Sequence, residues 1–223
     1  MNLCYLALSR FQCTIQLAGC NFNCRGCFSP ARFETGVVVP VESIVEHIPP
    51  GRRVVIAGGE PTLQAEELLK LLLLLRGRRV ILSTNGYFLS DQVVKRLSGF
   101  KVHIDLKAYT GSIHREYTGW SNLPVMEAIE RLHRHSVDFE VETVLVPGVV
   151  DSPEIGRVAE FLASISRTIS LRIIRYVPVN GFSRRPTEEE LAVTVALAQE
   201  YLSCVTTSAE VRNHPARSMK IFF

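Results

Sequence analysis

The sequence of 223 residues lacks a long hydrophobic segment, a marked excess of one charge and any low-complexity stretch. Its most aliphatic run, Leu71 to Leu75, is far short of the roughly 20 apolar residues that a membrane-spanning helix needs. Lysine and arginine number 25 against 22 aspartates and glutamates, so the net charge is only +3. These shortages argue against a membrane protein and against a dedicated nucleic-acid binder. Because no signal-peptide pattern opens the chain, we expect a cytoplasmic protein.

The cysteines are distributed too unevenly for a disulfide framework. Three of the six stand alone in the sequence: Cys4, Cys13 and Cys204. The other three, Cys20, Cys24 and Cys27, fall within one short segment. Thiolates at such spacing can converge on one soft metal ion or cluster. The sequence therefore predicts a metal centre near its amino-terminal end.

Strand-like and helix-like segments alternate along most of the chain. The pattern predicts strands at Phe11–Ala18, Arg53–Ala57, Val80–Thr84, Val102–Leu106, Phe139–Val146, Ile169–Val177 and Val205–Val211. It predicts helices at Val41–His47, Gln64–Leu75, Asp91–Leu97, Pro124–His133, Pro153–Ser164 and Thr187–Leu202. Repeated βα units imply a mostly parallel sheet, either open and doubly wound or curved into a barrel. No linker separates the units, so we expect a single domain.

Polar and apolar residues alternate along three of the expected strands. In Lys101–Lys107, for example, Val102, Ile104 and Leu106 alternate with lysine, histidine and aspartate. Residues 12–17 and 138–143 follow the same pattern. Helices cover the apolar side, so the polar side faces the interior of a curved sheet, which favours a cavity for a polar ligand. The alternative is an open sheet with a solvated polar face.

The segment Cys20–Cys27 carries the strongest chemical signal, a C-x3-C-x2-C loop directly after a strand. Three thiolates can bind three irons of a 4Fe–4S cluster and leave the fourth iron open for chemistry, whereas a purely electron-transferring cluster usually has four cysteine ligands. A structural zinc site also needs four ligands. Cys13 falls on the helix-facing side of its strand, so zinc would need a histidine and is the lesser alternative.

Five segments together resemble the radical S-adenosylmethionine (SAM) superfamily, and within it the activating enzymes of pyruvate formate-lyase and anaerobic ribonucleotide reductase. They are Gly19–Cys27, Gly58–Pro61, Thr84–Gly86, Asp105–Lys107 and Val146–Asp151. Each lies at the carboxyl end of an expected strand, where barrel enzymes assemble their sites. The resemblance implies an α/β fold, a single-domain partial (β/α)6 TIM-like barrel with mostly parallel strands. The domain would span residues 1–223, with a cluster loop at 19–30, a barrel core at about 11–203 and a C-terminal strand and tail at 204–223.

The resemblance also implies the ligands of the site. The 4Fe–4S cluster would be held by Cys20, Cys24 and Cys27. The SAM contacts would come from Gly26, Gly58, Gly59, Glu60, Asn85, Asp105 and Lys107. Glycines permit close backbone approach, and carboxylates can accept hydrogen bonds from the SAM ammonium group. No catalytic side chain is implied beyond the cluster and SAM.

The activity implied is that of a radical SAM oxidoreductase working under anaerobic conditions. An electron from a flavodoxin- or ferredoxin-type donor would cleave SAM to methionine and a 5′-deoxyadenosyl radical, which abstracts a hydrogen atom from the substrate. The first candidate substrate is a glycine of a partner glycyl radical enzyme. The second is a small polar molecule or a peptide, and a noncatalytic iron–sulfur or zinc protein is a distant third.

Overall fold

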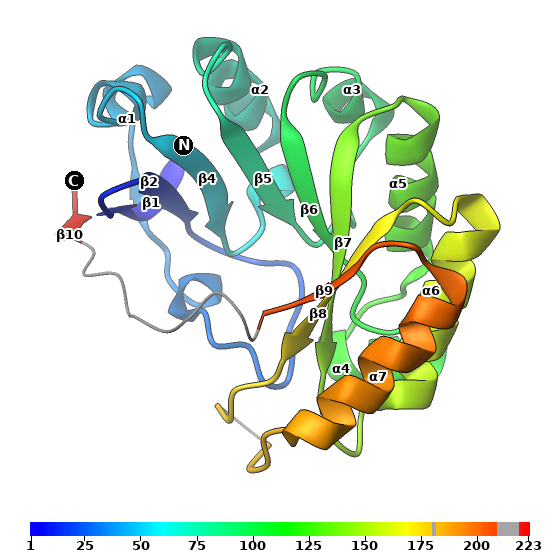
Figure 1. The fold of residues 1–223 in the computed structure, drawn as a ribbon. Coiled ribbons are helices and arrows are strands. Elements are labelled where there is room, and N and C mark those ends of the chain that lie inside the picture. Colours follow the sequence, from blue (N-terminus) through cyan, green and yellow to red (C-terminus); the bar gives the residue numbers. More distant parts are fainter. Residues whose placement is uncertain (180–181, 209–218) are drawn as a thin grey trace.

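The computed structural model describes residues 1–179, 182–208 and 219–223 (Figure 1). Its strands form one ten-stranded sheet in the order β10-β1-β2-β4-β5-β6-β7-β8-β9, with β3 paired to β1. The strands are β1 (Asn2–Leu8), β2 (Gln12–Leu17), β3 (Val37–Val38), β4 (Arg53–Gly58), β5 (Val80–Thr84), β6 (Lys101–Asp105), β7 (Asp138–Leu145), β8 (Ser170–Arg175), β9 (Val205–Thr207) and β10 (Met219–Ile221).

The helices lie along the outer side of the curved sheet (Figure 1). They are α1 (Val41–Glu46), α2 (Ala65–Leu74), α3 (Asp91–Val94), α4 (Gly111–Thr118), α5 (Leu123–Arg134), α6 (Ser152–Ile165) and α7 (Glu188–Tyr201), with two 3-10 turns, η1 (Pro30–Arg32) and η2 (Pro61–Gln64). None of the helices in the described ranges has both the length and the apolar character needed to cross a membrane.

The sheet is parallel from β2 through β9, and β1 adds to it in antiparallel orientation. Within the described residues the strand order ends at β10 on one side and β9 on the other, so the curved sheet does not close. Successive parallel strands joined through helices give the right-handed βα units that build such a sheet. The predicted partial barrel with mostly parallel strands is confirmed.

The hydrophobic core lies between the sheet and the helices. Val102, Ile104 and Leu106 are fully buried, as are Cys13 and Ile15 of β2. The polar residues that alternate with them remain half-buried on the opposite side of the sheet. The predicted division into an apolar outer face and a polar inner face is therefore present in β2 and β6.

The structure differs from the predicted elements in several places, and helix α4 and strands β3 and β10 were not predicted at all. The helix expected to reach Leu97 ends at Val94, ahead of the turn at Gly99, whose φ is +85°. The last strand ends at Thr207, and residues 209–211 of the strand predicted there lie outside the described residues. Strand β1 was not predicted, because a register shift between Leu3 and Tyr5 disturbs the alternation that identifies a strand.

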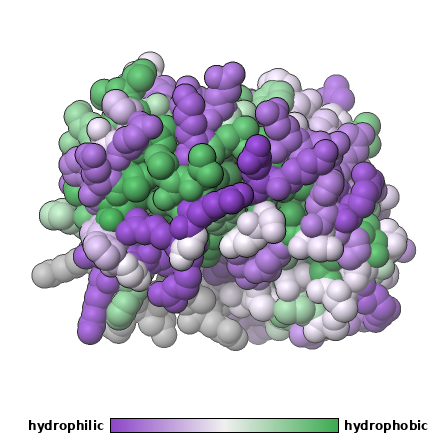
Figure 2. Space-filling view, turned by 90° about the horizontal axis from the view of Figure 1, so that it is seen from above, coloured by the Kyte–Doolittle hydropathy of each residue, from purple (hydrophilic) through white to green (hydrophobic). Residues whose placement is uncertain are grey.

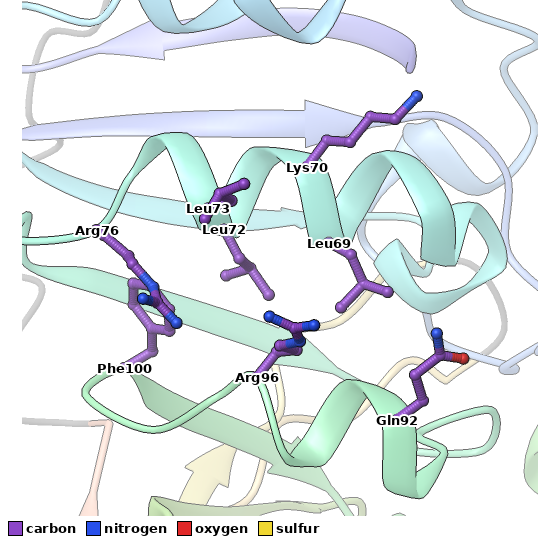
Figure 3. Close-up of a pocket in the computed structure, with 8 residues that line it drawn as sticks. All are labelled: Leu69, Lys70, Leu72, Leu73, Arg76, Gln92, Arg96 and Phe100. Carbon is purple, nitrogen blue, oxygen red and sulfur yellow. The ribbon is translucent and has the colours of Figure 1, made fainter.

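A groove of about 220 Å³ lies on the outer helix layer between α2 and α3 (Figure 3). Leucines and Phe100 line it together with the basic residues Lys70, Arg76 and Arg96. Figure 2 shows a hydrophobic area among hydrophilic side chains on the face seen from above. None of the residues that line the groove belongs to the five segments that resemble the radical SAM superfamily, so the groove is separate from the candidate active site.

Candidate active site

All five segments lie at the carboxyl edge of neighbouring parallel strands. The loop after β2 carries the cysteines, and β4, β5, β6 and β7 run directly into the other four segments. Backbone hydrogen bonds join the first two: Gly59 N donates to the Leu17 carbonyl at 2.9 Å, and Glu60 N donates to the Gly19 carbonyl at 2.7 Å. The turn after β4 is thus hydrogen-bonded directly to the start of the cysteine loop, at the end of the strands where barrel enzymes build their sites.

The three cysteines of the loop are partly exposed and make no disulfide. Burial raises the pKa of Cys20 to about 12, and the neighbouring thiols of Cys24 and Cys27 add to this rise. Burial likewise raises the pKa of Cys24 to about 11. The thiol protons would have to leave on metal binding, so metal affinity should increase with pH.

Helix α4 and an arginine fix the backbone of this loop. Asn23 N donates to the Thr118 carbonyl at 2.8 Å, and Arg25 N donates to the Tyr117 carbonyl at 2.9 Å. From the other side, Arg32 Nη1 donates to the Cys24 carbonyl at 2.5 Å. Three backbone groups between Cys20 and Cys27 are thus anchored by hydrogen bonds to the rest of the protein.

Cys13 is excluded as a fourth ligand by its position. Its side chain is fully buried in the core, on the helix-facing side of β2 as predicted. Burial raises its pKa to about 11, as befits a thiol that serves as a small core residue. The donor set of the loop is therefore three cysteines, which fits a cluster with one open iron better than it fits a closed four-thiolate site.

Gly58 and Gly59 allow β4 to pack directly against the cysteine loop. A Cβ atom on Gly58 would lie 2.2 Å from the Leu17 carbonyl oxygen, and one on Gly59 would lie 1.6 Å from the Gly19 carbonyl oxygen. Gly58 also has a φ of +136°, which side chains disfavour. The glycines expected to admit SAM are thus first required by contacts within the protein.

Glu60 is completely buried and serves as a connector. Its Oε1 accepts hydrogen bonds from Thr62 N, Thr62 Oγ1 and Thr84 Oγ1 at 2.9, 2.6 and 2.5 Å, and its Oε2 accepts from Asn85 N at 2.6 Å. Burial raises the pKa of Glu60, and these four bonds oppose the rise. The carboxylate thus ties the second segment to the third. The contact between Glu60 and the SAM ammonium group that the resemblance implies stays a prediction.

Asn85 contacts the cysteine loop from the end of β5, and Gly26 belongs to the loop. Asn85 Nδ2 donates to Asn21 Oδ1 at 2.8 Å and lies 3.9 Å from Cys20 Sγ. Gly26 has a φ of +103°, and a Cβ atom there would lie 3.1 Å from Tyr176 and 3.2 Å from Phe182. Gly26 therefore lets the loop pack against these two rings. Of the predicted SAM contacts, Asn85 has a side chain within weak hydrogen-bonding distance of a cysteine sulfur.

Asp105 and Lys107 form a shielded ion pair at the end of β6. Lys107 Nζ lies 2.7 Å from Asp105 Oδ1, and the side chains are only 15% and 23% exposed, respectively. Burial would lower the pKa of Lys107, but Asp105 and the nearby Cys24 outweigh this and raise it, so the ammonium stays charged. A cation and an anion held at the same edge can meet the carboxylate and the hydroxyl or ammonium groups of an amino-acid ligand.

Several contributors to this edge were not predicted. Tyr117, Tyr176 and Phe182 form an aromatic group against the cysteine loop, with Phe182 stacked on Tyr117 at 6.2 Å between ring centres. Helix α4, which supplies Tyr117, was not predicted; it has only eight residues and is polar on average.

Comparison with known proteins decides the family. The sequence profile of the radical SAM superfamily matches residues 15–162. The chain belongs to the radical SAM superfamily. A Methanocaldococcus jannaschii protein provisionally named a glycyl-radical enzyme activating enzyme is 34% identical over 226 residues, covering 96% of this chain and 87% of that protein. The pyruvate formate-lyase-activating enzyme of Listeria monocytogenes is 23% identical over 72% of this chain and 73% of its own length.

Solved structures share the fold of this chain. Streptococcus suis SuiB bound to its precursor peptide SuiA superposes with a TM-score of 0.72 at 16% identity and covers 86% of this radical SAM chain. The chain spans only 47% of SuiB, about half its length. A domain of the Bacteroides vulgatus pyruvate-formate lyase-activating enzyme gives a TM-score of 0.62 at 23% identity, covering 70% of this chain and 99% of that domain. The chain is a radical SAM oxidoreductase, and membership implies SAM and an iron–sulfur cluster.

Proposed function

We propose that Cys20, Cys24 and Cys27 bind one 4Fe–4S cluster and that the enzyme abstracts a hydrogen atom from a glycine of a partner protein. The observation that carries the cluster assignment is the donor set. Three neighbouring thiols share one anchored loop, while Cys13 is buried in the core on the other side of its strand. Such a set leaves one iron for a ligand.

The cluster, when bound and reduced, supplies the electron that cleaves SAM and so generates the hydrogen-abstracting radical. We infer that the chain's own residues bind SAM and orient it. The backbone of Gly58–Pro61, held in place by Glu60, offers carbonyl groups for the SAM ammonium. Asn85, Asp105 and Lys107 offer an amide, an anion and a cation at the same edge. Their shielding from water strengthens each polar contact.

The choice of a protein substrate rests on relatives. The Methanocaldococcus jannaschii protein, which the chain matches over nearly its whole length, bears the name of an activating enzyme, and Streptococcus suis SuiB was solved with a peptide. The sheet is open at one side, which leaves room for a peptide loop. A flavodoxin- or ferredoxin-type protein would supply the electron.

A second candidate, a small polar substrate, is favoured by the charged inner face of β6–β8. Two outcomes distinguish the candidates. With SAM, a reductant and its partner protein, an activating enzyme would produce a persistent glycine-centred radical, visible by electron paramagnetic resonance, in proportion to 5′-deoxyadenosine. A small-molecule enzyme would turn over many times without a persistent protein radical. Absence of SAM cleavage by the reduced, cluster-loaded protein would contradict both.

A further inference from the structure

Four charged or ionisable side chains meet on the inner face of the sheet, next to the Asp105 edge. They are His103, Glu140, Glu142 and Arg172, from β6, β7 and β8. The ligand atoms of the histidine and the two glutamates all lie within 4.8 Å of one another. The four side chains are between 12% and 24% exposed, so the group is shielded but reachable.

The two carboxylates of this group differ in their partners. Glu142 Oε1 lies 3.1 Å from His103 Nδ1 and accepts a hydrogen bond from Arg172 Nη1 at 3.4 Å. Although burial opposes it, His103 and Arg172 hold the pKa of Glu142 below its ordinary value. Glu140 Oε1 lies 3.8 Å from His103 Nε2 and 3.9 Å from Arg172 Nη1, beyond hydrogen-bond range. Among the residues that the structure describes, no donor bonds to the Glu140 carboxylate.

One guanidinium serves two carboxylates on this face. Asp105 is already paired with Lys107 at 2.7 Å. Arg172 Nη1 donates to Glu142 at 3.4 Å and lies 3.9 Å from Glu140, so within the described part of the chain Glu140 has no cation within hydrogen-bond distance. A shielded carboxylate without a hydrogen bond is unfavourable, and a ligand cation would relieve it.

The place of Glu140 suits a substrate that reaches the reactive edge. Glu140 pairs in register with His103, and Glu142 pairs with Asp105. Glu140 therefore lies two residues, roughly 7 Å, from the Asp105 level. A cavity of about 430 Å³ at the amino ends of these strands, lined in part by Lys101 and Asp138, includes none of the four residues and is separate from the group.

We propose that Glu140, supported by Glu142 and His103, binds a cationic group of the substrate, either a guanidinium or an alkylammonium. A divalent metal ion is the poorer occupant, because the Arg172 guanidinium lies among the same carboxylates and repels it. The inference rests on the proposed function only in taking the inner face of the sheet as the substrate side. An anchored alkyl chain of three or four carbons would present its far end at the Asp105 edge.

The test is a ligand-observed NMR titration of the cluster-loaded protein, without SAM, using n-butylguanidinium. Neutral n-butylurea, which has nearly the same shape, is the matched ligand control. We expect saturable binding of the cation and none of the urea. Glu140→Gln keeps the side-chain shape and removes the charge, so it should weaken binding by about tenfold or more, the effect of losing one charge-assisted hydrogen bond.

Asp138→Asn is the matched protein control. Asp138 is on the same strand but is exposed, so its loss should change the affinity by less than about twofold. Equal binding of the urea, or equal affinity in the parent and Glu140→Gln, would overturn the proposal. An effect of Asp138→Asn as large as that of Glu140→Gln would also overturn it, because the site would then be at the cavity mouth. Stoichiometric binding of Mn²⁺ that is lost in Glu140→Gln would overturn the proposal as well, because it would show that the group binds a metal ion.

A second variant covers the case in which Glu140→Gln does not fold. Ser170 is the register partner of Glu140 on β8, so Ser170→Lys would place an ammonium group beside the carboxylate. It should abolish n-butylguanidinium binding, and retained binding would contradict the proposal. An acetylated, amidated peptide Ala-Arg-Gly-Ala identifies the source of the cation: tighter binding than n-butylguanidinium indicates a protein side chain, and weaker binding a small molecule. Because no arm requires SAM cleavage, failure of the proposed function would leave these results intact.

Discussion

Two shielded carboxylates, Glu60 at the strand-end edge and Glu140 on the inner face, have opposite surroundings. Glu60 accepts four hydrogen bonds from the protein. Glu140 has its nearest cationic nitrogens at 3.8 and 3.9 Å. Buried polar groups in proteins are normally satisfied, so a satisfied carboxylate indicates a structural frame and an unsatisfied one indicates a place for a ligand. Glu60 therefore holds the backbone at the strand-end edge in place, whereas Glu140 presents a negative charge on the inner face of the sheet.

The largest expected effect concerns the edge itself. Replacement of Cys20, Cys24 or Cys27 by alanine should abolish the cluster, because each thiolate would hold one iron. Iron analysis and absorption spectra of anaerobically reconstituted protein are the measurement, with about one 4Fe–4S cluster per chain expected for the parent. Cys13→Ala is the control and should keep the cluster, since Cys13 is a core residue. A retained cluster in Cys24→Ala, or zinc without iron in the parent, would show that the edge is a different kind of site.

The second prediction compares the two carboxylates directly. Glu60→Ala removes the acceptor of two backbone amides, Thr62 and Asn85, and of two hydroxyls, Thr62 and Thr84. The free energy of unfolding should therefore fall by about 3 kcal/mol or more. Glu140→Ala removes only long-range contacts and should cost about 1 kcal/mol or less. Urea unfolding measures both. Equal losses would mean that Glu140 is part of the frame, and the contrast drawn between the two regions would not hold.

Local pattern was enough to predict the central strands. The strands β4 to β8 begin and end within two residues of the predicted boundaries because their two faces differ in polarity or because turns bound them. The edge strands β1 and β10 and the helix α4 gave no such signal. Strand β10 has only three residues, and α4 has eight residues that are polar on average.

The sequence predicted which segments lie at the strand ends, but it could not predict the contacts that their side chains make within the protein. The spacing of Cys20, Cys24 and Cys27 identified the loop, whereas the role of Glu60 depends on Thr84 and Asn85, which are 24 and 25 residues away. Only the pairing of β4 with β5 brings them together. The partners of His103 on β7 and β8 were likewise hidden, since the sequence shows alternation but not which polar side chains meet across strands.

The third prediction tests whether the edge also offers a side chain to SAM. Asp105→Asn removes an anion from a shielded ion pair and should weaken SAM binding by about tenfold, the effect of one lost charge-assisted hydrogen bond. Equilibrium dialysis with labelled SAM is the measurement, and the cluster spectrum should not change. The exposed variant Asp138→Asn should bind SAM like the parent. Unchanged SAM affinity in Asp105→Asn would assign the Asp105–Lys107 pair to the structural frame, beside Glu60.

The smallest expected effect concerns His114, a buried histidine of the frame behind the cysteine loop. Its ring packs on Phe22 at 5.6 Å, and its Nδ1 donates to the Trp120 carbonyl at 2.8 Å. Burial lowers the pKa of His114, which is therefore neutral in the folded protein at neutral pH. In the unfolded chain it takes up a proton near its ordinary pKa of about 6.5. Acidification thus favours the unfolded state.

The sign and size of this effect follow from proton linkage. Between pH 7.5 and pH 6.0 the His114 proton should lower the free energy of unfolding by at most about 0.8 kcal/mol, the value for a group protonated only in the unfolded chain. Urea unfolding of the parent and of His114→Gln at both pH values measures it. The packing lost in His114→Gln lowers the free energy of unfolding equally at both pH values, whereas protonation of His114 lowers it only in the parent and only at the lower pH. An identical pH dependence of the two proteins would show that His114 is free to be charged within the frame, and that the edge is less tightly closed than Glu60 indicates.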